Sequence, residues 1–148
     1  MANLLALTLH IFLLGAMVTF MVVTTPTVFK TLDQQSSQKF LRSIFPRLFK
    51  YCLVLVLTAG ILFIIGKSFY GSIISIISAC GFLVNTYIVT PRINKLRDLS
   101  IENDIIAKKS FRLMHLVSVL VYLFQILGSI SILILYSLNH ILFFFKNI

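Results

Sequence analysis

Four long stretches of the chain contain no charged residue. They run over residues 1–29, 51–66, 68–91 and 113–145. A helix crosses the hydrocarbon core of a membrane with about 20 apolar residues, so each stretch predicts a transmembrane helix. The second stretch is short, but Lys50 and Lys67 at its ends can extend their ammonium groups to the lipid headgroups.

We therefore predict an all-α fold: a four-transmembrane-helix bundle that forms a single integral membrane domain over residues 1–148. The expected helices cover about 4–29, 37–66, 69–91 and 101–138. The last one is expected to end before Asn139 and His140, because these polar residues interrupt the apolar run. No internal repeat is evident in the sequence.

Composition supports a membrane protein and excludes a nucleic-acid-binding one. Hydrophobic residues make up 59% of the chain and charged residues 11%, and the mean hydropathy is +1.02. A soluble domain of this size cannot bury that much apolar surface. The formal net charge is +9, but a nucleic-acid-binding face needs a broad polar surface, and this chain has too little polar sequence to form one.

The basic residues are distributed unevenly between the two ends of the predicted helices. The two long loops, residues 30–50 and 92–112, hold all the Lys and Arg residues except Lys67 and Lys146. Positively charged loops stay on the cytoplasmic side of a membrane. The sequence therefore predicts cytoplasmic loops at 30–50 and 92–112, both termini outside, and a location in a bacterial inner membrane.

Each cytoplasmic loop also contains helical signals. Between residues 37 and 51, apolar residues recur every three or four positions, with basic residues between them. We expect a basic amphipathic juxtamembrane helix before the second transmembrane helix, in contact with anionic lipid headgroups. Each basic residue near such a surface contributes about 1 kcal/mol. In the other loop, Ser100 is expected to cap a helix that begins at Ile101.

Small residues and prolines predict where the helices pack closely and where they bend. Small residues spaced by four allow close helix contact in lipid; these are Gly71, Ser75 and Ala79. Proline removes a backbone donor and crowds the preceding turn, and the expected kinks are at Pro26, Pro46 and Pro91.

The chain lacks the common catalytic and nucleotide-binding motifs CxxC, HExxH, GxSxG and the Walker A loop. We therefore expect a non-enzymatic protein without a metal site. Polar residues gather at one depth, at the cytoplasmic ends of the helices, and are candidates for binding a ligand or a lipid headgroup. They are Asn85, Arg92, Arg112 and His115.

His10 is a candidate haem ligand, because it lies inside a predicted transmembrane helix of a four-helix bundle. The sequence thus leaves three hypotheses. The first is a membrane scaffold or a bundle that binds lipid or a small ligand, with an oligomer or a membrane-protein partner as a further expectation. The second is a protein that binds haem b or another tetrapyrrole. The third is a small transporter or channel, suggested by the proline-rich cytoplasmic ends.

Three segments resemble a known family: GAMVTFMVVTTPTVFKTLDQQSSQKFLRSIFPRLFKY, VTPRINKLRD and KKSFRLMHLVSVL. They are similar to the small four-helix membrane proteins related to human transmembrane protein 205, grouped as domain of unknown function 4149. The matching residues are Pro26, Phe29, Phe45, Pro46, Pro91 to Asn94, Phe111 and His115. The resemblance implies an integral membrane protein and no particular reaction.

A weaker resemblance is to the membrane protoporphyrinogen oxidases and the copper-resistance four-helix proteins. It rests on His10 with Ile11, on Pro26 to Phe29, and on Phe111 to Leu113. The chain differs from that family after the proline of the first helix, where it reads TPTVFK. This resemblance implies a shared four-helix bundle and a tetrapyrrole ligand.

Overall fold

The structure is a computed structural model that describes residues 1–101 and 104–146, and it is entirely helical over them. The elements are α1 (Ala2–Thr19), η1 (Phe20–Thr24), α2 (Thr25–Thr31), α3 (Gln34–Ile65), α4 (Phe69–Val84), η2 (Asn85–Val89), α5 (Thr90–Ile101) and α6 (Ile105–Lys146). Both η elements are π-helical turns. Four helical stretches are long and apolar enough to cross a membrane: Ala2–Thr31, Gln34–Ile65, Phe69–Ser100 and Ile105–Asn139. The prediction of an all-α protein with four such helices is confirmed.

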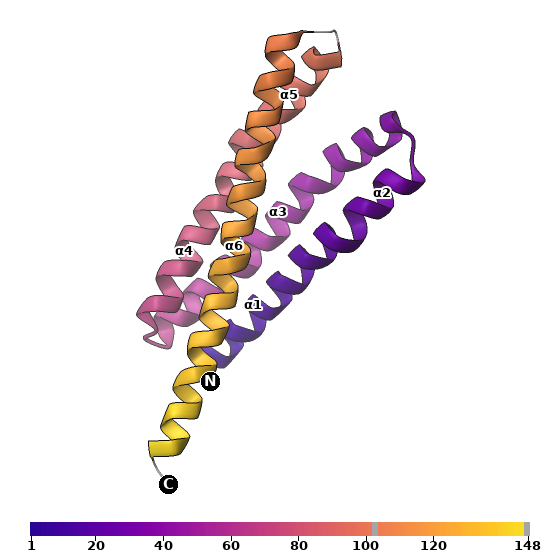
Figure 1. The fold of residues 1–148 in the computed structure, drawn as a ribbon. Helices are drawn as coiled ribbons and strands as arrows, with labels where there is room; N and C mark the ends of the chain where they lie inside the picture. The colour runs from indigo at the N-terminus through magenta and orange to yellow at the C-terminus, as the bar shows by residue number, and fades with distance from the viewer. Residues whose placement is uncertain (102–103, 147–148) are drawn as a thin grey trace.

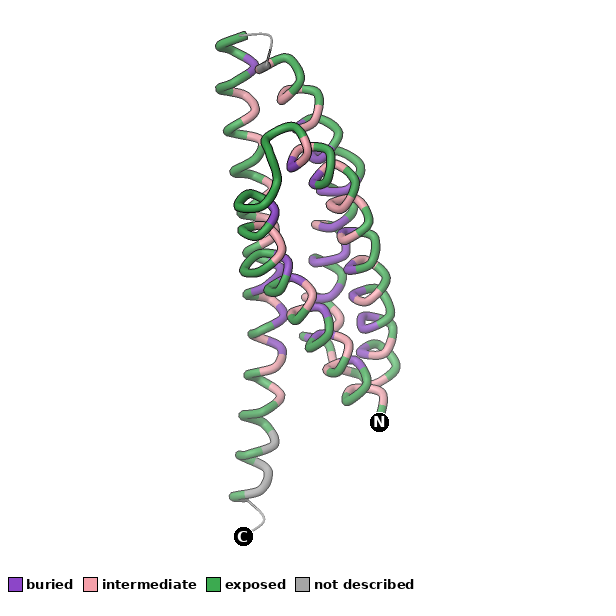
Figure 2. The backbone as a smooth tube through the Cα atoms, turned by 90° about the vertical axis from the view of Figure 1, so that its right-hand side faces the viewer, coloured by how far each residue is buried: buried purple, intermediate pink, exposed green. Residues whose placement is uncertain are grey.

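The helices form two hairpins (Figure 1). The first consists of α1, η1 and α2 with α3 as its return helix, and the second of α4, η2 and α5 with α6. The hairpins pack together near the N-terminus and spread apart toward the α2–α3 and α5–α6 connections (Figure 1). Buried residues lie on the sides of the helices that face one another, as Figure 2 shows.

Aspartate caps set the starts of both return helices. Asp33 Oδ1 accepts hydrogen bonds from the backbone N–H groups of Gln35 and Ser36, at 2.9 and 3.0 Å. Hydrogen bonds from Ser36 hold the pKa of Asp33 below its usual value. Helix α3 therefore begins at Gln34 and runs without a break through Pro46, so the segment predicted as a juxtamembrane helix is its first part.

The predicted bounds of the fourth helix were wrong at both ends. It begins at Ile105, because Asp104 Oδ1 accepts from the N–H groups of residues 106 and 107, at 2.8 and 3.0 Å. Ser100, the expected cap, lies inside α5 and donates to the carbonyl of Arg97. At the other end the helix continues past residue 138 to Lys146, since no glycine or proline follows to stop it.

A π-helical turn precedes a Thr-Pro pair in each hairpin. The Thr25 N–H donates to the carbonyl of Phe20, five residues back, and the Thr90 N–H donates to that of Asn85. The next residue is proline in both cases, Pro26 and Pro91. Proline has no N–H and its ring crowds the carbonyl four residues earlier. The wider turn accommodates the ring while the helix continues.

The two hairpins are parallel structural repeats, offset by 65 residues. Five buried positions of α1 and η1 correspond at this offset to five buried positions of α4 and η2. They are Ala6, His10, Leu13, Met17 and Phe20 in the first repeat, and Gly71, Ser75, Ser78, Phe82 and Asn85 in the second. The repeat is not evident from the sequence, because few of the corresponding residues are identical.

His10 is fully buried where the repeats meet. Its Nε2 lies 3.0 Å from Ser75 Oγ, and its Nδ1 lies 3.0 Å from Ser129 Oγ. Ser75 donates its own hydroxyl proton to the carbonyl of Gly71. Ser75 therefore accepts from Nε2–H, and Ser129 donates to Nδ1. With the ring of Phe63 beside it, centroid to centroid 5.8 Å, the histidine contacts residues of α3, α4 and α6.

The small residues at the start of α4 allow close contact with α3. Gly71, Ser75 and Ala79 are all buried. A Cβ atom on Gly71 would lie 2.7 Å from ring carbons of Phe63, and one on Gly60 would lie 3.2 Å from the Cβ of Ser75. Larger side chains at the two glycines would push α3 and α4 apart.

The His10 hydrogen bonds give a first prediction. Ser129→Ala removes the donor to Nδ1, and interhelical hydrogen bonds in membrane proteins contribute about 0.6 kcal/mol on average and up to about 1.7. We expect the variant to lose about 0.6 to 1.7 kcal/mol of its free energy of unfolding, measured by titration with sodium dodecyl sulfate. Thr58→Ala is the control, because Thr58 is exposed and bonds only within α3. Equal losses for the two variants would contradict the role of His10.

Candidate functional site

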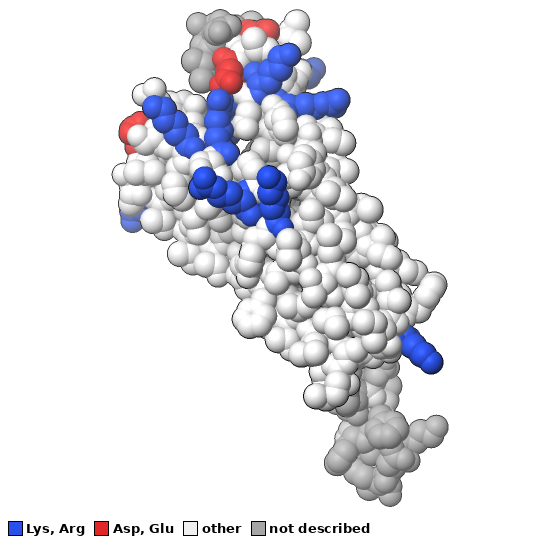
Figure 3. Space-filling view, turned by 180° about the vertical axis from the view of Figure 1, so that it is seen from behind, with Lys and Arg blue, Asp and Glu red and all other residues white. Residues whose placement is uncertain are grey.

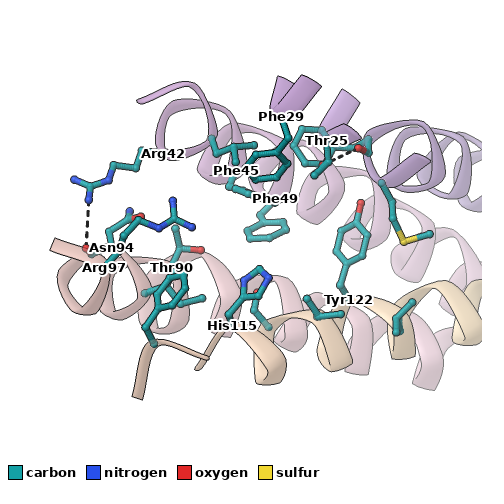
Figure 4. A pocket seen from close by; sticks show the side chains of 18 residues that line it. Thr25, Phe29, Arg42, Phe45, Phe49, Thr90, Asn94, Arg97, His115 and Tyr122 are labelled. Atoms are coloured by element: carbon teal, nitrogen blue, oxygen red, sulfur yellow. Dashed lines mark hydrogen bonds between the residues drawn. The ribbon is translucent and has the colours of Figure 1, made fainter. Parts of the chain in front are cut away.

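A pocket of about 450 Å³ lies between the two hairpins, on the side where they spread apart (Figure 4). We call it the interhairpin pocket. Residues of both repeats line it: Phe20, Met21, Thr25, Phe29, Leu41, Arg42, Phe45, Phe49, Thr90, Ile93, Asn94, Arg97, Phe111, His115, Ser118, Val119, Tyr122 and Leu123. Its volume lies in the range of small-molecule binding sites.

Aromatic rings form much of the pocket wall. Leu41, Phe45 and Phe49 are spaced by four and therefore share one face of α3. The ring of Phe45 lies 5.1 Å from Phe20 and 5.6 Å from Phe49, centroid to centroid. Across the pocket, the Tyr122 hydroxyl donates to a carbonyl of α1 at 2.9 Å, so its polar end is satisfied. The wall is suited to an apolar molecule.

Arginine side chains from both hairpins line the end of the pocket nearest the loops. Arg42 of α3 forms an ion pair with Asp98 of α5 and donates to the carbonyl of Asn94 at 3.4 Å. The Arg97 guanidinium lies over the ring of Phe111, 5.0 Å from its centroid. Figure 4 shows Arg42, Asn94 and Arg97 together at this end of the pocket.

His115 continues this arrangement along α6. Its ring is stacked on that of Phe111, with centroids 6.0 Å apart and planes 8° from parallel. The Phe111 ring thus has contacts with both the Arg97 guanidinium and the His115 imidazole. One end of the pocket is therefore cationic and hydrogen-bonding, while its walls are aromatic.

A second pocket lies beyond the first, at the tips of the hairpins. We call it the tip pocket; its volume is about 670 Å³. Its lining is richer in amide and hydroxyl groups: Phe29, Leu32, Gln34, Ser37, Gln38, Arg97, Ser100, Lys108 and Phe111. Phe29, Arg97 and Phe111 line both pockets. These three residues therefore form the boundary between an aromatic pocket and a polar one.

Most basic side chains of the described chain surround the same end of the molecule. Figure 3 shows Lys and Arg gathered where the α2–α3 and α5–α6 connections lie. Lys67 is in the α3–α4 turn, at the opposite end of the hairpin formed by α2 and α3. The electrostatic potential at the two pockets is therefore positive, which attracts anions.

The structure brings only one of the four predicted headgroup-binding residues into the pocket lining. His115 lines the interhairpin pocket, whereas Arg92 and Arg112 are exposed and lie outside both linings. Asn85 is fully buried in η2. Within the described part of the chain, neither atom of its side-chain amide has a hydrogen-bond partner.

Sequence reasoning missed Arg42, Asn94 and Arg97. Thr90, Ile93, Asn94 and Arg97 follow the i, i+3, i+4, i+7 spacing that places residues on one helical face. Phe111, His115, Ser118 and Tyr122 form a similar stripe on α6. These stripes could have identified the lining, because they combine aromatic and polar residues on faces that point to the other hairpin.

His10, the candidate haem ligand, lies outside both pocket linings. Both of its ring nitrogens are in hydrogen bonds with serines, so coordination of iron would require one of these bonds to break. Among residues 1–101 and 104–146, no three His, Cys, Asp or Glu side chains cluster as metal ligands would.

Comparison with known proteins places the chain in a family. A family model described as "Domain of unknown function (DUF4149)" matches residues 8–101, which include most of α1, the rest of the first hairpin, α4, η2 and α5. No curated protein and no solved structure gave a significant match. The matched region contains both Thr-Pro pairs, together with Arg42, Asn94 and Arg97 of the pocket. The chain therefore belongs to the DUF4149 family of proteins, whose molecular function is unknown.

Proposed function

We propose that this protein is a non-enzymatic membrane protein that binds an anionic amphiphile in the interhairpin pocket. The apolar part of the ligand packs against the aromatic wall, and its anionic group lies near Arg42 and Arg97. The observation that carries the proposal is the combination of this wall with two arginines at one end of the same pocket.

Charge supports an anionic ligand over a cationic one. The residues that line the interhairpin pocket include two arginines, and no described lining residue is Asp or Glu. Hydrogen bonds from arginine to carboxylate or phosphate are stronger than those between neutral groups. A site at the boundary of the membrane can therefore hold an anion by these bonds and an alkyl chain by burial of apolar surface.

The position of the pocket between two parallel repeats also supports a binding role. Membrane proteins built from repeats commonly bind their ligands at the repeat interface. In this chain, residues of η1 and α2 line one side, and residues of α5, which follows η2, line another. π-Helical turns of this kind occur frequently at functional sites.

The proposal includes an orientation in the membrane. Loops 30–50 and 92–112 face the cytoplasm of a bacterial inner membrane, since they carry most of the basic residues. The arginine end of the pocket then lies near the anionic headgroups of the cytoplasmic leaflet, from which an amphiphile can enter.

Labelling of single cysteines tests this orientation. In a protein with Cys52 and Cys80 replaced by alanine, we expect Lys67→Cys to react with a membrane-impermeant maleimide added to intact spheroplasts. Gln35→Cys should react only after the membrane is opened. Both positions are exposed and lie at opposite ends of the first hairpin. The reverse pattern would contradict the proposed orientation.

Filling the pocket tests the binding function. Val119 lines the pocket on α6, and the indole ring of Val119→Trp should project into the pocket and clash with a bound alkyl chain. With the protein in lipid nanodiscs, we expect saturable photo-crosslinking of a diazirine-labelled palmitate to wild type. In the variant we expect the apparent affinity for the palmitate to fall about tenfold or more, which corresponds to a loss of at least about 1.4 kcal/mol of binding free energy.

Val117→Trp is the matched control. Val117 and Val119 have side chains exposed to 38% and 39% on the same helix, but only Val119 lines the pocket. The control should crosslink as wild type does. Labelling that does not saturate, or equal labelling of the two tryptophan variants, would overturn the proposal.

The absorption spectrum of the purified protein separates this proposal from the haem hypothesis. A Soret band that disappears in His10→Ala and persists in Val119→Trp would assign a haem to His10. It would show that the interhairpin pocket is not the site of ligand binding. A spectrum without such a band, combined with saturable palmitate labelling, would support the amphiphile.

A further inference from the structure

The two pockets meet at a single charged side chain. Arg97 lines the interhairpin pocket and the tip pocket, while Arg42 lines only the former and Lys108 only the latter. Lys108 is accompanied by amide and hydroxyl groups, among them those of Gln34 and Gln38. The boundary between the pockets therefore consists of one cation and the rings of Phe29 and Phe111, with further aromatic rings in the interhairpin pocket and hydrogen-bonding groups in the tip pocket.

We propose that the ligand is a single-chain phosphodiester amphiphile with a hydroxylated head. Its chain lies in the interhairpin pocket, its phosphate at Arg97, and its head in the tip pocket beside Lys108. This inference rests on the proposed function and specifies the chemical class of its ligand.

The phosphodiester follows from the order of the two pockets. A phosphodiester carries a substituent on either side of its charge, which corresponds to an arginine with one pocket on either side. A fatty acid ends at its carboxylate, so it would leave the tip pocket without an occupant. Phosphate oxygens can also accept charge-assisted hydrogen bonds from the Arg97 guanidinium.

Arg97 is better placed than Arg42 to bind the phosphate. Arg42 is already paired with Asp98. The Arg97 guanidinium lies over the face of Phe111 and has Asp98 as an electrostatic neighbour, but within the described part of the chain it forms no hydrogen bond of the kind that Arg42 donates to Asn94 and Asp98. Its N–H groups therefore remain available to an anion, and the ring beneath holds its plane in position.

The volume of the interhairpin pocket fits one chain. Its volume of about 450 Å³ is in the lower part of the range of small-molecule sites, about 300 to 1,000 Å³. A lipid with two chains would have to leave one of them outside the pocket.

The hydroxylated head follows from the lining of the tip pocket. The side-chain amides of Gln34 and Gln38, both on α3, line it. An amide both donates and accepts, as the hydroxyl groups of a glycerol or sugar head require. The hydroxyls of Ser37 and Ser100 already donate to backbone carbonyls, so they can only accept from such a head. The ammonium of Lys108 disfavours a cationic head such as choline.

Competition against the crosslinking palmitate in nanodiscs tests this class. The competitors are palmitoyl lysophosphatidylglycerol, palmitoyl lysophosphatidylcholine, hexadecyl phosphate and unlabelled palmitate. We expect lysophosphatidylglycerol to compete about tenfold more strongly than palmitate, because its head accepts a further hydrogen bond from the Lys108 ammonium, and a hydrogen bond to a charged group is worth about tenfold or more. Hexadecyl phosphate, which has the phosphate but no head, should be intermediate.

Two pairs of variants locate the phosphate and the head. Arg97→Gln should weaken the binding of lysophosphatidylglycerol and of hexadecyl phosphate about tenfold. Lys95→Gln, two residues away and outside both linings, should leave the binding of both unchanged. Lys108→Gln should weaken the binding of lysophosphatidylglycerol and leave that of hexadecyl phosphate unchanged. Lys109→Gln, which changes the neighbouring residue outside both linings, should affect neither.

The outcomes separate this inference from the proposed function. Equal competition by palmitate and lysophosphatidylglycerol would overturn the phosphodiester class and leave the amphiphile site in place. Equal competition by the glycerol and choline lipids, or equal effects of Lys108→Gln and Lys109→Gln, would overturn the placement of the head. Palmitate labelling that no competitor reduces would overturn both proposals.

Discussion

The hydrogen bonds of His10 hold the two hairpins together at corresponding positions of the two repeats. His10 and Ser75 are 65 residues apart, which is the offset between the repeats, and the bond between them joins α1 to α4. A polar group inside a membrane must find its partners within the protein. Because these helices can satisfy the imidazole and both serines only where they meet, the contact fixes their register and keeps the hairpins in contact at this depth. The hairpins are therefore free to separate only toward the other end, which is where the interhairpin pocket lies.

The two π-helical turns follow this fixed contact along the chain, and Phe20 and Met21 of η1 line the pocket. Each places an extra residue in the helix just before a Thr-Pro pair. One residue corresponds to about 100° of rotation in an α-helix, so the residues after the turn present a different face from the one that a continuous helix would. On α5 the resulting face carries Thr90, Asn94 and Arg97 into the pocket and leaves Arg92 exposed. The prolines thus influence the site by setting which side chains face it, and no proline contributes to its lining.

This rotation explains how far the sequence could predict the structure. The four spans were predictable, because the hydrocarbon core requires long uncharged helices whatever their neighbours are. Position along the length of the bundle was predictable for the same reason, and His115 lines the pocket at the end where the hairpins spread apart. Rotation about the helix axis was not predictable beyond Pro91, since nothing in the pattern of apolar residues reveals a π-helical turn. Arg97 lies beyond Pro91 and was therefore missed. Arg42 lies on α3, which contains no π-helical turn, and it was missed because the sequence predicted only a basic helix in contact with lipid headgroups there. The cap of α6 was misassigned because Ser100 and Asp104 are both good caps, and only the contacts show which of them bonds the free N–H groups.

The same basic residues can serve both orientation and binding, because the two requirements constrain different properties. Orientation depends on how many Lys and Arg residues a loop carries, and hardly on which helical face they occupy. Binding depends on whether a residue lies on the helical face that points to a pocket. Lys95 and Arg97 contribute equally to orientation, but only Arg97 lines a pocket. In the same way Lys108 and Lys109 contribute equally to orientation, and only Lys108 lines a pocket. Since the orientation signal is redundant, a basic residue could be recruited to the pocket without changing how the chain inserts. In a chain with most of its positive charge at one end, some of the residues that set the orientation can therefore also bind an anion at that end.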